Sequence, residues 1–474
     1  MPAPRRRLRT AHDELRAGFA AIRDEHDVPI EFPDEVTAAA GEAARSGPTD
    51  SSPRRDLTDI PFVTIDPPGS TDLDQAMHLS RRGSGYRVRY AIADTAAFVV
   101  PGSALDRVTH ERVETVYCPD VRVPLHPPVL SEGAASLLPD QDRPAVVWTL
   151  DLDQDGQVGE VGVERALVRS RAQLDSPTEQ RRLDASPGSD DVIVLLAEIG
   201  TRRAVLERAR GGVSLGRPEQ EVVDAPGGGW ALAYRASLAV EDHNAQISLM
   251  TGMAAAALML EVGVGVLRTM PPAQPRDIER LRRQALALGV PWPAGRPYGD
   301  VLAGLDHSRP GTAAFLTEAT SLFRGAAWTP FRGNPPRERD HGAVGAPYAH
   351  VTAPLRRLVD RYGSEICLAA HAGTAVPDWV LEALPALGEE MAVGARRGAA
   401  VDRACTDLVE AAVLAAHVGQ VFDGVALDER TVQLHGPAVV ARTEGGDLTP
   451  GEHVRVRLVT ADVPSRTVLF RQDA

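Results

Sequence analysis

Residues 64–76 read TIDPPGSTDLDQA, and no other stretch of the chain is as informative. The apolar letters around it predict a short strand that ends at Asp66, and a Pro-Pro-Gly turn follows. Asp72 and Asp74 then stand two positions apart. In an extended chain both side chains project to one side, with Leu73 on the other. The sequence therefore predicts three carboxylates gathered at the end of a strand.

Carboxylates brought together in this way repel one another unless a cation lies among them. Hard oxygen ligands suit Mg²⁺, with Mn²⁺ as an alternative, and such ions promote phosphoryl-type displacements by activating water and neutralising the leaving oxygen. An ordinary acidic turn with solvated side chains explains the same letters equally simply. A calcium loop is disfavoured because the EF-hand spacing is missing, and an aspartyl-nucleophile phosphatase needs a lysine, which the chain lacks.

A second informative stretch is YAHVTAPLRRLVDRY, at residues 348–362. Thr352 is a candidate helix N-cap, and Pro354 is tolerated in the first turn. Arg356 and Arg357 are then expected near a helix N-terminus, where free backbone N–H groups favour anions and an arginine can fork onto a phosphate. A capped helix with surface arginines is the simpler interpretation.

The pattern along the chain predicts an α+β protein in three parts. We expect a helical segment and linker over 1–55, a mixed α/β domain over 56–415, and a small OB-like β-barrel over 416–474. Short apolar and alternating strands dominate residues 60–175. Helical periodicity is expected over residues 8–26, 34–45, 192–210, 238–260, 276–288, 312–325, 356–372 and 378–416.

Composition narrows the class of protein further. Of 474 residues, 43% are hydrophobic, which excludes wholesale disorder, and the net charge of −14 argues against general polyanion coating. Three scattered cysteines form neither a disulfide framework nor a zinc site, so we expect a reducing cytoplasm. We expect no signal peptide and no membrane span; residues 249–267 come closest to one.

These two stretches, in this order, resemble motifs of the ribonuclease II / ribonuclease R exoribonucleases. The first is similar to the family pattern T-I-D-x5-D-hydrophobic-D-D-A, and the second to Y-x-x-x-T-S-P-I-R-R-Y. Between them, residues 91–146, from AIADTAAF to DRPAV, resemble the family's segment that begins IADV and contains PGS and T-x-Y-L-P. The resemblance implies a ribonuclease II-type catalytic domain and an S1-like barrel, in a short form without cold-shock domains.

The resemblance also implies a function and its residues. It implies Mg²⁺-dependent, processive 3′→5′ hydrolysis of single-stranded RNA to nucleoside 5′-monophosphates, in a monomer without a stable protein partner. The implied catalytic residues are Asp72, Asp74 and Arg356. The implied metal ligands are Asp66, Asp72, Asp74 and Gln75. The residues implied to touch RNA are Tyr117, by stacking on a base, with Arg356 and Arg357.

One departure from the family pattern keeps a second hypothesis open. The fourth motif aspartate is Gln75 here, which offers a neutral oxygen in place of a charged one. Ala353 and Asp402 also stand where the family has a serine and usually a glutamate. A catalytically weak or inactive RNA-binding protein of the same fold is therefore the alternative. A metal-dependent phosphatase acting on small phosphoesters is a third possibility, and it would need neither Tyr117 nor the barrel.

Overall fold

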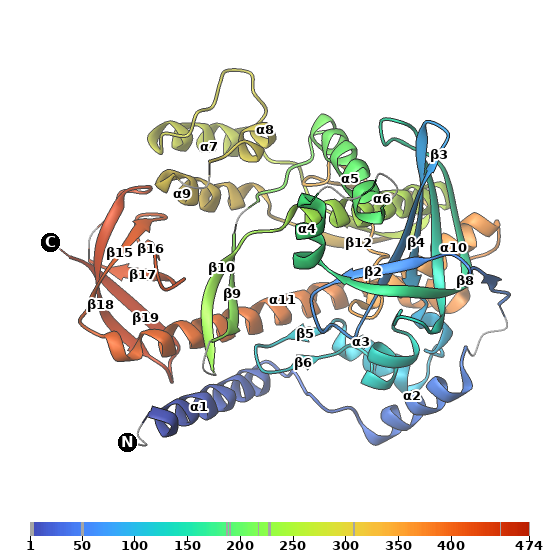
Figure 1. Ribbon diagram of the computed structural model, residues 1–474, viewed down its shortest axis with the longest axis horizontal. Helices are drawn as coiled ribbons and strands as arrows, with labels where there is room; N and C mark the ends of the chain where they lie inside the picture. The colour runs from blue at the N-terminus through green and yellow to red at the C-terminus, as the bar shows by residue number, and fades with distance from the viewer. Residues whose placement is uncertain are drawn as a thin grey trace.

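The computed structural model of the chain has an α+β architecture, with a large sheet at one end and a small barrel at the other (Figure 1). Long helices connect the two ends. The structure describes residues 4–48, 52–185, 188, 191–216, 218–225, 229–306, 309–445 and 447–473.

The main sheet has six strands in the order β1-β8-β2-β3-β4-β7. β7 also pairs with β8, so the strands from β8 to β7 return on themselves. β8 is parallel to β1 and β2, and the other neighbours are antiparallel. The strands are β1 (Arg55–Asp56), β2 (Phe62–Asp66), β3 (Gln75–Arg82), β4 (Gly85–Ala93), β7 (Asp142–Leu152) and β8 (Val158–Asp175).

Residues 64–76 lie at the ends of two neighbouring strands of this sheet. The predicted strand is confirmed, because β2 ends at Asp66, and β3 begins at Gln75. The residues between them form the connection, and Leu73 anchors it with a fully buried side chain. The acidic stretch is therefore fixed at both ends by strands and in its middle by the core.

Helices cover the sheet and supply most of the remaining core. α6 packs against α5 and α10, and its length and apolar composition would suffice to cross a membrane, yet half of its most apolar window is buried inside the protein. These properties are those of a core helix, as its contacts indicate. The helices are α2 (Asp34–Ser46), α3 (Ala104–Arg112), α4 (Ser176–Asp184), α5 (Val192–Ala209), α6 (Ala239–Val262) and α10 (Leu358–Ala372).

The longest helix, α11 (Asp378–Leu414), runs from beside the sheet to the barrel, and α1 (Pro4–Glu25) packs along it (Figure 1). Gly18 makes this packing close, since a Cβ there would lie 2.6 Å from a Leu408 methyl carbon. Phe19 of α1 is fully buried, with its ring edge on Trp230. The N-terminal helix is thus part of the core that joins the two ends of the molecule.

The barrel predicted at the C-terminal end is present. Its strands close in the order β15-β16-β17-β19-β18. In β18 the alternation of HVRVRLVT is realised, with Val454, Val456 and Leu458 buried and Arg455 and Arg457 exposed. The strands are β15 (Val421–Ala426), β16 (Thr431–Leu434), β17 (Val440–Glu444), β18 (His453–Asp462) and β19 (Thr467–Gln472).

Several smaller elements were not anticipated. The antiparallel pair of β9 (Glu219–Asp224) and β10 (Trp230–Arg235) lies between the main part of the molecule and the barrel (Figure 1). The others are β5 (Val116–Tyr117), β6 (Arg122–Val123), β12 (Ala327–Arg332), β13 (Asp340–His341), β14 (Ala346–Pro347) and α8 (Tyr298–Ala303). β12 pairs with β11 (Val264–Thr269), the strand that follows α6. The predicted helices 276–288 and 312–325 correspond to α7 (Pro275–Ala287) and to α9 (Pro310–Ala319) with a 3₁₀ turn after it.

Candidate active site

Asp66 is a half-buried carboxylate of the site, and Asp74 is a buried one. Asp66 ends β2, and its Oδ2 atom is buried without a hydrogen-bond partner among the described residues. Burial raises the pKa of Asp66 to about 6. Asp74 is 2% exposed, and burial raises its pKa to about 7. The site thus holds two carboxyl groups whose charged forms are disfavoured until positive charge is added nearby.

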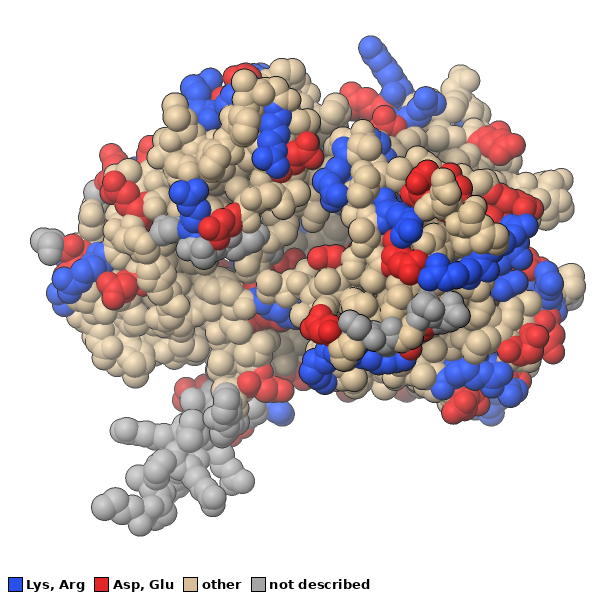
Figure 2. Space-filling model, turned by 45° about the horizontal axis from the view of Figure 1, so that its top comes forward, with Lys and Arg blue, Asp and Glu red and all other residues tan. Residues whose placement is uncertain are grey.

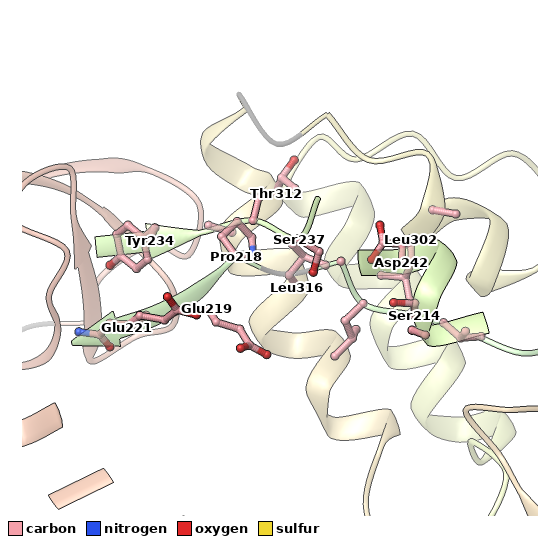
Figure 3. A pocket seen from close by; sticks show the side chains of 18 of the residues that line it. Ser214, Pro218, Glu219, Glu221, Tyr234, Ser237, Asp242, Leu302, Thr312 and Leu316 are labelled. Atoms are coloured by element: carbon pink, nitrogen blue, oxygen red, sulfur yellow. The ribbon is translucent and has the colours of Figure 1, made fainter. Parts of the chain in front are cut away.

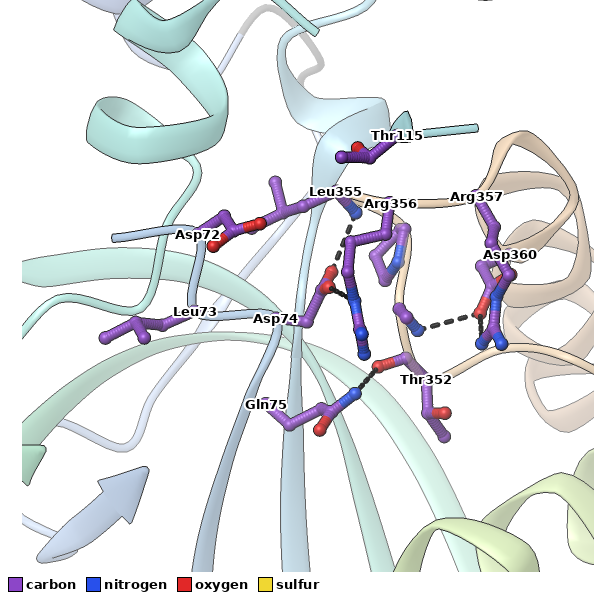
Figure 4. A network of polar contacts seen from close by, with 12 residues as sticks. Asp72, Leu73, Asp74, Gln75, Thr115, Thr352, Leu355, Arg356, Arg357 and Asp360 are labelled. Carbon is purple, nitrogen blue, oxygen red and sulfur yellow. Dashed lines mark hydrogen bonds and ion pairs between the residues drawn. The ribbon is translucent and has the colours of Figure 1, made fainter. Parts of the chain in front are cut away.

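Asp74 binds the second informative stretch directly (Figure 4). Its Oδ1 accepts a hydrogen bond from the Leu355 backbone N–H at 2.7 Å, and its Oδ2 accepts one from Arg356 Nε at 2.8 Å. The Arg356 side chain is 43% exposed. Among the described residues, only Nε of Arg356 has a hydrogen-bond partner. Its two terminal nitrogens are therefore available to a ligand.

Arg357 is held differently from its neighbour. Its Nε and Nη2 atoms fork onto Asp360 at 2.9 and 2.8 Å, and Asp360 Oδ1 also accepts the Ala353 N–H at 2.7 Å. The prediction of an N-cap at Thr352 is wrong, because α10 begins only at Leu358. The Thr352 hydroxyl instead meets that of Ser248 at 2.8 Å. The side chain of Asp360 organises this turn, which the sequence pattern did not indicate.

Asp72 and Gln75 point to partners outside the Asp74 network. Asp72 pairs with Arg122, which also contacts Glu132 at 2.6 Å. The Gln75 side-chain amide donates to the backbone carbonyl of Thr352 (Figure 4). The expected gathering of three carboxylates around one point is therefore corrected. Within the described ranges, no group of three His, Cys, Asp or Glu side chains is placed to hold a metal ion.

A small cavity of about 290 Å³ opens beside this network. Arg356 and Arg357 line it together with Tyr117, whose ring is 52% exposed, and with Glu114 and Asp402. The structure thus brings the three predicted RNA-contacting residues to one cavity. Glu114 and Asp402 add two carboxylates that the prediction did not include in the site.

Tyr117 and Asp402 also line a second, larger cavity of about 1480 Å³, so the two cavities meet at these residues. The larger one lies among α5, the β9–β10 pair, α9 and α11 (Figure 3). On the molecular face shown in Figure 2, acidic and basic side chains are interspersed, without a continuous basic band. Tyr117 lines both cavities, whereas Arg356 lines only the small one. An extended ligand that enters through the large cavity therefore reaches Tyr117 before Arg356.

Comparison with known proteins places this arrangement in a family. The model of the RNB domain matches residues 54–367, and the model of the RNase II-type exonuclease C-terminal S1 domain matches residues 420–473. The chain belongs to the RNB family. The resemblance seen in the motifs is thereby confirmed, as is the RNB fold with its terminal barrel.

Individual RNB proteins show how far the likeness extends. Ribonuclease R of *Escherichia coli* is 26% identical over 456 residues, which cover 87% of this chain and 54% of that protein. The apo form of *Mycoplasma genitalium* RNase R matches with a TM-score of 0.85 at 18% identity, over 97% of this chain and 78% of the other. Yeast Ssd1, described as a pseudonuclease, matches with a TM-score of 0.69 at 15% identity, over 90% of this chain and 57% of the other. The chain spans about half the length of the curated relatives it matches.

RNB exoribonucleases are metal-dependent, so the fit of a metal to these residues matters. Asp66, with its orphaned buried oxygen, and Asp74 are hard anionic donors of the kind that divalent cations require. Gln75 adds a neutral side-chain oxygen close by, since its nitrogen is the atom bound to Thr352. The donor chemistry therefore fits a divalent cation, with Asp66 and Asp74 as its main ligands and with Asp72 pairing with Arg122 instead.

Proposed function

We propose that this RNB protein is a Mg²⁺-dependent 3′→5′ exoribonuclease that hydrolyses single-stranded RNA processively to nucleoside 5′-monophosphates. One observation carries the proposal: Arg356 is held by a buried carboxylate, its terminal nitrogens have no partner among the described residues, and it shares the small cavity with Tyr117, at which the large cavity begins. *M. genitalium* RNase R, of similar fold, has been solved in complex with ribose-methylated single-stranded RNA.

Each side chain has a role that follows from its contacts. Asp74 fixes Nε of Arg356, so the guanidinium is held ready to grip a phosphate and stabilise the charge that develops in the transition state. Tyr117 offers its exposed face to a terminal base, and stacking of this kind is tolerant of sequence. Asp360 holds Arg357 at the cavity wall.

Asp66 and Asp74 would hold Mg²⁺, with Mn²⁺ as the alternative ion, and Gln75 would assist, whereas Asp72 stays paired with Arg122. A divalent cation bound there supplies charge neutralisation and an activated water nucleophile. Asp74 already carries a raised pKa without such a charge, because it is buried. The protein's own contribution is to keep both oxygens of Asp74 ordered through the Leu355 N–H and Arg356.

The alternative, an RNA-binding protein with weak or no catalysis, rests on Gln75. Its side chain is a neutral amide whose nitrogen donates to the Thr352 carbonyl, so it brings no negative charge to the metal site. The pseudonuclease Ssd1 has a similar fold, which makes loss of catalysis on this fold a concrete option. Gln75→Asp restores the motif carboxylate but also removes the hydrogen bond to Thr352. A gain in activity would show that the missing charge matters more than this hydrogen bond, and a loss would show the reverse.

A time course on 5′-labelled single-stranded RNA with Mg²⁺ or Mn²⁺, run beside Asp74→Asn, tests the proposal. We expect a ladder that shrinks to a short limit product, absent in the variant. RNA bound but left intact with both metals would move the conclusion to the binding protein, with Gln75→Asp as the rescue. Hydrolysis of p-nitrophenyl phosphate without hydrolysis of RNA would favour the phosphatase.

The setting of the protein belongs to the same proposal. We place it in the cytoplasm as a monomer that binds single-stranded RNA and needs no stable protein partner. The three cysteines are free thiols, in agreement with a reducing compartment. Light scattering on the purified protein tests the monomer, and fractionation of cells tests the compartment.

A further inference from the structure

Two cysteines lie together at the junction of the two cavities. Cys118 directly follows Tyr117, and Cys405 lies one helical turn after Asp402 on α11. β5 packs against α11, Cys118 packs against the buried cluster that contains Cys405, and both thiols line the large cavity. Two residues that are 287 positions apart in the sequence are thus brought into contact beside Tyr117.

The N-terminal helix adds a cation to this pair. Arg23 of α1 is 5% exposed and contacts Asp120 at 2.6 Å, and its charge acts on Cys118. The Cys405 thiol and the guanidinium of Arg23 lower the pKa of Cys118 to about 7, whereas that of Cys405 is raised. Cys118 is therefore the thiol of the pair that is more readily ionised and nucleophilic.

The third cysteine shows what an inert thiol looks like in the same protein. Cys367 is fully buried on α10, donates weakly to the Ala255 carbonyl at 3.7 Å, and burial raises its pKa. It lines neither of the two cavities that meet at Tyr117. The chain therefore offers an internal control for any reaction that depends on the surroundings of Cys118.

We propose that Cys118 and Cys405 form a redox-modification site, in which a hydroperoxide oxidises Cys118 and Cys405 closes a reversible disulfide. In the first step the Cys118 thiolate attacks hydrogen peroxide, the O–O bond breaks, and one proton is taken up to give a sulfenic acid and water. In the second step Cys405 sulfur attacks the sulfenic sulfur, the S–O bond breaks, and the proton of Cys405 leaves with hydroxide as a second water. A thiol reductant reverses the bond by exchange.

The cross-link would act on the passage that leads to the catalytic pocket. It fastens the β5–β6 loop, and with it Tyr117, to the turn of α11 that carries Asp402. The terminal base of an RNA strand has to pass between these residues, so oxidation is expected to weaken RNA binding. This consequence rests on the proposed function, whereas the disulfide itself does not.

Mass spectrometry of the whole protein after brief exposure to hydrogen peroxide tests the site directly. We expect a loss of about 2 Da, reversed by dithiothreitol, with the Cys118 and Cys405 peptides linked after digestion. Cys405→Ser should stop at a sulfenic acid on residue 118 that dimedone traps, and Cys367→Ser should behave as the wild type. An unchanged mass, a link through Cys367, or the same 2 Da loss in Cys118→Ser would overturn the proposal.

Two further measurements separate the parts of the proposal. At pH 6.5, Arg23→Gln should slow alkylation of Cys118 about 10-fold, because less of the thiol is ionised, while reaction at Cys367 is unchanged. Equal alkylation rates of Cys118 in Arg23→Gln and in the wild type would show that Arg23 does not promote ionisation of this thiol. RNA binding by the oxidised and reduced protein is then compared: disulfide formation with unaltered binding would disprove the gate, and would leave both the disulfide and the nuclease standing.

Discussion

The small and the large cavity differ in their balance of charge although they share two residues. Two guanidinium groups and two carboxylates line the small cavity of about 290 Å³. The large cavity of about 1480 Å³ has Arg208 as the one arginine in its described lining. Its carboxylates outnumber that arginine; they are Glu207, Glu219, Glu221, Asp242 and Asp402.

This difference suggests that the two cavities have different roles in binding RNA. Affinity for nucleic acid usually comes from basic side chains that neutralise phosphates along a groove. Here two arginines balance two carboxylates where we place the chemistry, and the approach to it is acidic. We infer that the end of the RNA is held by Arg356 and Tyr117, and that the passage adds little attraction. This contrast between the two cavities can be tested by substitutions in each of them.

Removing the arginine of the small cavity should have the largest effect. In Arg356→Gln the amide can still donate to Asp74, but the charge that grips the phosphate is lost. Loss of one such stabilising group costs about 100- to 1000-fold in rate. Single-turnover hydrolysis of labelled RNA measures the effect, and a thermal melt checks that the fold is intact. A rate within threefold of the wild type would show that Arg356 lies outside the reaction.

Loss of the tyrosine should come next. Tyr117→Ala removes the exposed ring that the two cavities share, and a lost stacking contact costs about 1–3 kcal/mol per base. RNA binding measured with Asp74→Asn as the background, to prevent hydrolysis, should weaken accordingly. Tyr117→Phe keeps the ring and is the matched control. Equal RNA affinities of the alanine and phenylalanine variants would show that the ring of Tyr117 does not stack on a base.

Neutralising the acidic passage should strengthen binding slightly. Glu219 and Glu221 line the large cavity, and in Glu219→Gln/Glu221→Gln the ion-pair partner Arg235 keeps its contact with Glu241. Two charges at about 10 Å from phosphates predict a three- to fivefold gain in affinity at low salt, which high salt should abolish. Glu261→Gln, an exposed change outside both cavities, is the control. A weaker RNA complex in the double variant would contradict the acidic-passage view.

Local pattern predicted the elements of the fold well, because each depends on neighbouring residues. The strand that ends at Asp66, the helix of α7 behind Pro275, and the alternation in β18 were all found from the letters alone. The β9–β10 pair is not among the predicted elements, although its alternating letters and the glycines around residue 229 are typical of a hairpin.

The parts of the site that the sequence did not indicate depend on distant partners. Asp72 stands beside Asp74 in the chain, yet it pairs with Arg122, 50 positions away. Thr352 has the character of an N-cap, but Asp360 holds that turn and the helix begins later. Side-chain partners of this kind are set by tertiary packing, on which the local pattern carries no information.

The smallest expected effect concerns Glu410, which fastens the wall of the large cavity. This α11 carboxylate is 5% exposed and accepts hydrogen bonds from Gln220 of β9 at 2.7 Å and from the Val440 N–H of β17 at 2.9 Å. Burial raises the pKa of Glu410 from 4.5 to about 7. Above pH 7 the group is ionised in both the folded and the unfolded chain, so its burial opposes folding there. Below pH 4.5 both states carry the proton and the cost disappears.

Glu410→Gln keeps an acceptor oxygen for both donors and removes the buried charge. We expect it to stabilise the protein at pH 8 by about 1 kcal/mol, or roughly 2 °C in Tm for a chain of this size, with the gain fading as the pH falls from 7 toward 4.5. Thermal melts at pH 5, 6.5 and 8 give the profile. Because Glu410 lies in neither cavity, RNA hydrolysis should stay unchanged. A variant that loses stability at pH 8 would mean that the charge itself holds β9 and the barrel together, and the rigidity of the large cavity would then depend on an ion rather than on packing.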